Sequence, residues 1–239
     1  MPRFVELWIY LSATPLFGLT ATLVVYLLAN AAYARLGSPP WANPVLWSVI
    51  ALASGLIATG VDYPTYFAGA QFIHFLLGPA VVALAWPLWQ RRIELRARFG
   101  RLMLAALLGG AAACASAVAL GWAVGLPHDV VLSLAPKSVT AGVAMGISES
   151  LGADPSLSAA AVVLTGIMGA IIVTPLMNRT GVTDYRARGF AAGLAAHGIG
   201  TARAFQVDEI AGVFSGIAMS LNALVTSFLV PLAVTLLVR

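Results

Sequence analysis

Long apolar runs dominate the sequence, and short polar or Gly- and Pro-containing stretches separate them. The runs cover, approximately, residues 4–29, 44–60, 71–90, 102–126, 156–178 and 209–236. A helix needs about 20 apolar residues to cross the hydrocarbon core of a bilayer. The pattern therefore predicts several membrane-spanning helices. The first run is longer than the apolar core of a usual signal peptide, so we expect it to be a membrane helix too.

Two further segments, 137–152 and 189–203, have a helical pattern but are more polar and richer in Gly. Such segments are typical of helices that are broken or that re-enter the membrane. The predicted fold is an all-α integral membrane protein with about six to eight transmembrane segments, two of them interrupted.

Composition supports a membrane environment for the whole chain. Of the 239 residues, 60% are hydrophobic and only 9% are charged. A soluble domain usually carries roughly a quarter charged residues, so this chain cannot cover a water-facing surface. We therefore expect a single multi-pass membrane domain over residues 1–239.

Arginine residues indicate the orientation of the helices. Segment 91–101 holds five Arg, and segment 179–188 holds three. The positive-inside rule places both segments in the cytoplasm and the loop at 127–129 in the periplasm. Segment 137–152 would then be entered from outside and segment 189–203 from inside. The net charge of +4 reflects these anchors and does not indicate nucleic-acid binding.

Weak internal similarity suggests a repeat. The sequence PLWQR at 87–91 resembles PLMNR at 175–179, and Gly78 and Gly166 align at the same offset. Pro–Leu at a helix end also arises by chance, so both explanations stay open.

Pairs of Gly four residues apart allow helices to approach closely in lipid. They are Gly121/Gly125, Gly142/Gly146, Gly189/Gly193 and Gly212/Gly216. Their concentration predicts a scaffold-like half at 1–101, a tightly packed half at 102–239 that carries the substrate site, and a homodimer.

The first candidate site surrounds Lys137, the only lysine. Pro136 suits a helix start, and Ser138 or Thr140 can cap free N–H groups. On one helix, Ser138, Gly142, Met145 and Glu149 would form a stripe. A helix N-terminus beside a lysine favours an anionic ligand. Alternatively, Lys137 snorkels to the interface and Glu149 faces a loop.

The second candidate site is the run His197, Gly198, Ile199, Gly200, Thr201, Ala202 and Arg203. Arg can bind a carboxylate in a bidentate fork. Thr201 and His197 are four residues apart, so they share a helix face and could bind a hydroxyl. Alternatively, Arg203 ends a helix in the cytoplasm and His197 is a core residue. The clustering of polar residues favours binding, because polar groups in lipid are costly.

Thr165 and Asn222 are single polar residues within long apolar helices. Each should face protein or a water-filled cavity, although interhelical hydrogen bonds explain them equally well. The sequence contains no Gly–x–Ser–x–Gly, HExxH or Walker motif. With one cysteine, Cys114, it also offers no cysteine metal site. We therefore expect no enzyme activity, cofactor or metal.

Several blocks of the sequence resemble the LrgB/CidB family. They are Asn43–Pro44, Tyr63, Tyr66, LLGPAVVALA at 76–85, PKSVT at 136–140, Thr165–Gly166 and HGIGTAR at 197–203. The resemblance implies a multi-pass protein of the bacterial inner membrane. Members of the family are described as antiholin-like partners that control murein hydrolase activity and cell lysis. Relatives have been linked to the movement of glycolate, glycerate or pyruvate.

The resemblance leaves two functions to weigh. In the first, the protein transports a small carboxylate. Lys137 and Arg203 would bind the carboxylate, Ser138, Thr140 and Thr201 would contact hydroxyls, and Glu149 and His197 could couple a proton. In the second, it is an antiholin-like regulator that acts with a small holin-like membrane protein of the LrgA/CidA type.

Overall fold

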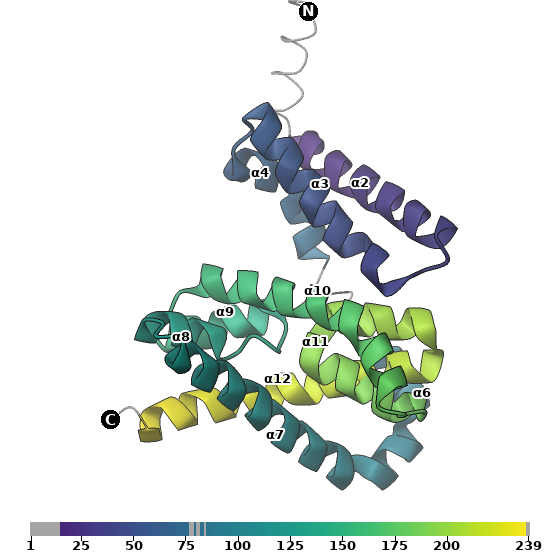
Figure 1. Ribbon diagram of the computed structural model, residues 1–239, viewed down its shortest axis with the longest axis vertical. Helices are drawn as coiled ribbons and strands as arrows, with labels where there is room; N and C mark the ends of the chain where they lie inside the picture. The colour runs from purple at the N-terminus through teal and green to yellow at the C-terminus, as the bar shows by residue number, and fades with distance from the viewer. Residues whose placement is uncertain (1–14, 77–78, 80–81, 84, 238–239) are drawn as a thin grey trace, which may run out of the picture. The chain divides into compact units, whose positions relative to one another are not determined.

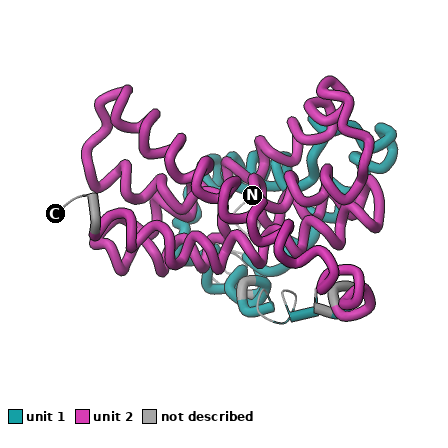
Figure 2. Tube along the Cα trace, turned by 90° about the horizontal axis from the view of Figure 1, so that it is seen from below, with its two compact units in different colours: residues 1–86 teal, residues 87–239 magenta. Residues whose placement is uncertain are grey.

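The computed structural model describes residues 15–76, 79, 82–83 and 85–237. The helices in this part of the chain confirm the predicted all-α membrane fold (Figure 1). Their contacts divide the chain into two compact units, residues 1–86 and 87–239 (Figure 2). The assignment of scaffold and substrate-binding roles to 1–101 and 102–239 stays a prediction.

The first unit contains three α-helices and one short 3₁₀-helix among its described residues. They are α2 (Pro15–Arg35), η1 (Pro40–Ala42), α3 (Pro44–Thr59) and α4 (Tyr63–Phe75). The side chain of Asn43 caps α3 by accepting hydrogen bonds from the N–H groups of Val45 and Leu46. Helices α2 and α4 touch at Gly18, because a Cβ there would overlap the backbone carbonyl of Tyr66. The hydroxyls of Thr22 and Tyr66 form a hydrogen bond of 2.6 Å between the same helices.

The second unit contains the two predicted interrupted segments. Its helices are α7 (Arg92–Ala123), α8 (His128–Leu134), α9 (Ala141–Ser150), α10 (Pro155–Arg179), α11 (Tyr185–Val207) and α12 (Glu209–Leu237), and α6 (Ala85–Gln90) lies at the boundary between the units. Helix α12 packs against α11, and it crosses α7 (Figure 1).

Four described helices, α2, α7, α10 and α12, are long and apolar enough to cross a membrane by themselves. This number is below the predicted six to eight because some of the other segments are short or interrupted, and because the predicted run 71–90 includes residues outside the described ones. Helix α3 has only 16 residues, and α8, α9 and α11 belong to the broken segments.

The arginine-rich segment 91–101 is helical, although the apolar run begins only at residue 102. Ion pairs of Glu94 with Arg91 and Arg98, one turn away on either side, support this helix. The 32 residues of α7 extend roughly 48 Å, compared with about 30 Å for the hydrocarbon core. The first turns of α7 therefore extend beyond the membrane core.

The first interruption lies between α8 and α9, at residues 135–140. We expected a helix to start at Pro136, and this was wrong: α9 starts at Ala141. Turn hydrogen bonds from the N–H of Lys137 to Leu134 and of Val139 to Pro136 occupy the segment before it. Ser138 therefore does not share a helical stripe with Glu149.

Side-chain capping of α9 was also predicted, and the structure does not show it. Thr140 occupies the N-cap position of α9, but its side chain makes no capping hydrogen bond.

The second interruption lies inside α11, where Ala196 and His197 have non-helical backbone angles. Before this break, Gly189 and Gly193 face α12, and a Cβ at either position would overlap the backbone carbonyl of Ala211 or Ser215. This Gly pair therefore packs two helices of one chain. Gly142 and Gly146 on α9 face open space.

Ion pairs gather the starts of three helices on one side of the second unit. Arg186 Nε lies 2.9 Å from Glu94 Oε1, and Arg91 lies 3.8 Å from Glu209. The two basic segments, 91–101 and 179–188, are therefore on the same side, as the positive-inside rule requires. Gly78 lies outside the described residues, so the internal repeat stays a prediction.

Candidate functional site

Asn222 of α12 joins the two interruptions. Its amide nitrogen donates to the backbone carbonyl of Ser138, between α8 and α9, at 3.1 Å. It also donates to the carbonyl of Leu194, just before the break in α11, at 3.0 Å. The two carbonyl oxygens are thus at most 6.1 Å apart. Asn222 is only 1% exposed, and its bond to Ser138 is buried.

Contacts within α12 and with α7 fix the orientation of the Asn222 amide. Thr226 donates a hydrogen bond to its oxygen at 3.3 Å. Gly110 of α7 leaves room for the same oxygen, because a Cβ there would lie 2.6 Å from it. A helix break leaves backbone groups without their regular partners, and Asn222 supplies a partner at both breaks.

His197 forms the break in α11 and is itself buried. Its backbone has φ 41° and ψ −131°, a conformation that Gly adopts far more readily than other residues. The ring nitrogen Nε2 lies 2.9 Å from the carbonyl of Val162 in α10. The ring packs over Gly166, where a Cβ would lie 2.6 Å from it. Contacts with α10 therefore hold a residue whose backbone is strained.

The starts of two half-helices lie near these contacts. Val162, which binds His197 through its carbonyl, packs against Val139 and Ala144 of the first interruption. The first regular helical bond of α9 runs from Ala144 to Thr140, so the N–H groups before it are free of helical partners. On the α11 side, Gly198 is exposed and only the Met219 sulfur, at 4.0 Å, approaches its Cβ position.

Two other predicted residues of α11 point into the protein. The hydroxyl of Thr201 donates to the carbonyl of His197 at 2.8 Å and pairs with the hydroxyl of Ser215 at 2.9 Å. Gly200 packs against the carbonyl of Ala192. Thr165 is half-buried in α10, beside the Gly166 that receives the His197 ring.

Lys137 and Glu149 lie at different ends of α9. Lys137 is half-buried in the first interruption, close enough to Cys114 of α7 for an electrostatic interaction. Glu149 is exposed in the last turn of α9. The ten residues of α9 span roughly 15 Å, so the structure does not bring these two side chains together.

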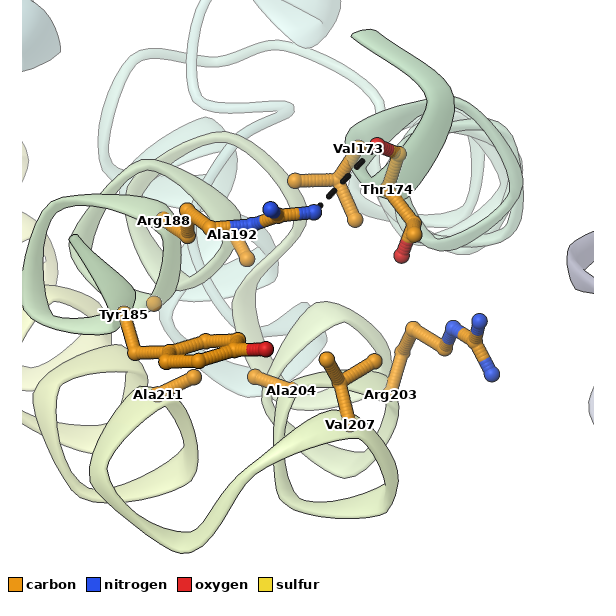
Figure 3. A pocket seen from close by; sticks show the side chains of 10 residues that line it. Val173, Thr174, Tyr185, Arg188, Ala192, Arg203, Ala204, Val207 and Ala211 are labelled. Carbon is orange, nitrogen blue, oxygen red and sulfur yellow. Dashed lines mark hydrogen bonds between the residues drawn. The ribbon is translucent and has the colours of Figure 1, made fainter. Parts of the chain in front are cut away.

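Arg203 lines a small cavity of its own. The cavity of about 20 Å³ is also lined by Thr174, Tyr185 and Arg188, and Lys137 is not among the lining residues. Such a volume holds about one water molecule. Arg188 donates to the carbonyl of Thr174 at 3.4 Å, and Arg203 extends away from the ring of Tyr185 (Figure 3). Arg203 is only 7% exposed, so its burial exceeds that expected of a cytoplasmic anchor.

Comparison with known proteins identifies the family. The sequence matches the LrgB-like family over residues 22–236. The chain belongs to this family. The predicted resemblance is therefore confirmed, and the LrgB-like protein is a multi-pass membrane protein of the LrgB/CidB group.

Named relatives cover nearly the whole LrgB-like chain. It is 34% identical to the uncharacterized protein YxaC of Bacillus subtilis, over 90% of this chain and 93% of that protein. It is 31% identical to the holin-like protein CidB of Staphylococcus aureus and 30% identical to that of Staphylococcus epidermidis, again over 90% and 93%. No solved structure matches this LrgB-like chain.

Sequence reasoning missed three residues of the site in the LrgB-like protein. Gly110 makes room for Asn222, Val162 supplies a backbone carbonyl to His197, and Ser215 pairs with Thr201. Gly110 has a weak sequence signal, since Gly inside an apolar helix often marks a close contact. A backbone acceptor such as that of Val162 has none.

Proposed function

We propose that the protein transports small 2-hydroxy or keto monocarboxylates, such as glycolate or glycerate, across the bacterial inner membrane. The observation that carries the proposal is the double hydrogen bond of Asn222, which holds two helix interruptions together. Secondary transporters bind anions at the N-termini of interrupted helices. There, free N–H groups and the helix dipole favour negative charge.

Roles follow from the placement of each side chain. Lys137 supplies a positive charge beside the start of α9, and we assign Ser138 and Thr140 to a substrate hydroxyl. The backbone N–H groups of Gly198 and Gly200 in α11 would donate hydrogen bonds to the same anion. We place Thr165, His197 and Thr201 beside these groups. Arg203 lines a separate cavity, and we assign it to carboxylate binding at another stage of transport.

Uptake into liposomes tests the proposal. Purified protein should take up labelled glycolate, and K137Q should lower the initial rate at least about tenfold, the effect of losing roughly 1.4 kcal/mol of binding. The matched control is R96Q, which removes an exposed positive charge on α7 and should leave uptake unchanged. No uptake above empty liposomes for several small acids would refute the proposal.

Proton coupling is a separate part of the proposal. His197 and Glu149 are the acid–base side chains that we assign to it. An inward proton gradient should then raise the initial rate of uptake. Equal rates with and without the gradient would exclude coupling.

The names of the relatives favour a second candidate function. Two of them are called holin-like proteins, which supports an antiholin-like role in the control of murein hydrolases and lysis, with a small LrgA/CidA-type partner. Under this alternative, K137Q and R203Q should keep any lysis phenotype. Under the transport proposal, both variants should lose transport, so measuring both properties separates the functions.

A further inference from the structure

A groove runs along α7, α11 and α12 on the side where the basic segments meet. Its volume is about 380 Å³. The charged residues that line it are Arg98, Arg101, Asp184 and Arg186, and its apolar wall includes Leu102, Phe190 and Phe214. All of these residues belong to the second unit.

Positive charge is in excess at this groove. Glu94 pairs with Arg98 at 3.7 Å and with Arg186 at 2.9 Å, so one carboxylate serves both guanidinium groups. Asp184 accepts the backbone N–H of Arg186 at 2.8 Å and caps α11. Arg101 is exposed and makes no ion pair with any described residue. The lining therefore carries three positive charges and one negative charge.

The groove also lies at a boundary between polar and apolar surface. Arg98 and Arg101 belong to the basic first turns of α7, and the apolar run begins at Leu102. An occupant must therefore match a basic rim and an apolar wall at the same time. A small soluble anion matches only the rim.

We propose that this groove binds an anionic phospholipid of the cytoplasmic leaflet. The phosphate group pairs with Arg101, Arg98 and Arg186, and an acyl chain packs along Leu102 and Phe190. Basic pockets between membrane helices bind anionic head groups in this way, and each Arg near an anionic surface adds about 1 kcal/mol. None of the residues that we assign to the transported anion lines this groove.

Lipid binding to the purified full-length protein tests the proposal. Native mass spectrometry would measure the affinity for phosphatidylglycerol and for phosphatidylcholine in the same detergent. We expect R101Q to weaken phosphatidylglycerol binding about fivefold. R96Q, which removes an exposed arginine of the same helix outside the groove, should not weaken it.

A second pair of variants tests the apolar wall without changing charge. A105W fills the groove, whereas A112W adds the same ring at an exposed position outside it. Only A105W should weaken phosphatidylglycerol binding. Equal losses in R101Q and R96Q would overturn the proposal, as would equal affinity for the two lipids. Displacement of the lipid by millimolar inorganic phosphate would overturn it too, because the groove would then be an anion site.

Discussion

Asn222 has three hydrogen-bonding partners. Its amide nitrogen donates to two backbone carbonyls, and its amide oxygen accepts from the hydroxyl of Thr226. An unpaired buried carbonyl costs about 1–3 kcal/mol. The residue therefore contributes to stability as well as to the geometry of the proposed site.

Replacing the Asn222 amide by a carboxyl group tests this role. N222D keeps the size of the side chain but removes the N–H donors, so we expect unfolding to be easier by about 1–3 kcal/mol for each carbonyl left unpaired. Thermal unfolding in detergent measures the change. S227A is the control, because Ser227 bonds only to Ala223 within α12. An N222D protein as stable as the wild type would contradict the account.

The backbone at His197 allows a different test. Alanine and glycine both remove the ring, but only glycine tolerates the positive φ without strain. We expect H197G to unfold at a higher temperature than H197A, with a difference of about 1 kcal/mol. If H197A is the more stable variant, the break is not strained. Both variants should lower transport, because both lose the contact with Val162.

Residue types could be predicted better than their partners. The cost of polar groups in lipid identified His197 and Asn222. Most of their partners are the backbone carbonyls of Ser138, Val162 and Leu194. Every residue has a backbone carbonyl, so the residue type does not identify such a partner. Only the three-dimensional structure reveals these contacts.

Helices α11 and α12 approach each other closely. Gly193 lies against the carbonyl of Ser215, and Gly189 against that of Ala211. The adjacent buried residues Ala192, Ala204 and Ala211 form a cluster between the same helices. Small residues at this interface let the broken helix lie directly against α12, which carries Asn222.

Adding one methyl group at this interface should be costly. G193A forces α11 away from α12, and we expect destabilisation of at least about 1–3 kcal/mol. G146A is the matched control, because a Cβ at Gly146 meets nothing within 4 Å. This second change should stabilise α9 by up to about 1 kcal/mol. Similar unfolding temperatures for the two variants would show that the close contact has no energetic role.

The helices themselves were only partly predictable. Apolar runs located α3, α10 and α12 to within a few residues. They missed the first turns of α7, because arginine-rich helix carries no apolar signal. They also missed the start of α9, because the turns at 135–140 depend on Asn222, which is distant in the sequence.

For the molecule as a whole, the ion pair of Glu94 with Arg186 predicts that the starts of α7 and α11 lie on the same side of the membrane. Single cysteines at Arg96 and Thr183, in a C114A background, should react with a membrane-impermeant maleimide only in inside-out vesicles. V124C, at the other end of α7, should react only in right-side-out vesicles. Labelling of R96C and T183C on opposite sides would contradict the structure, whereas a reversal of all three would contradict only the positive-inside assignment.

The two bonds of Asn222 also have a kinetic consequence. An amide group has two hydrogens, and both are engaged by backbone carbonyls. Any movement that separates α9 from α11 must first break one bond and leave a buried carbonyl unpaired, at about 1–3 kcal/mol. A barrier of this size slows such a movement between about fivefold and 150-fold. Asn222 therefore adds to the barrier for separating the two interruptions, and a weaker donor at residue 222 would make this movement faster while making the protein less stable.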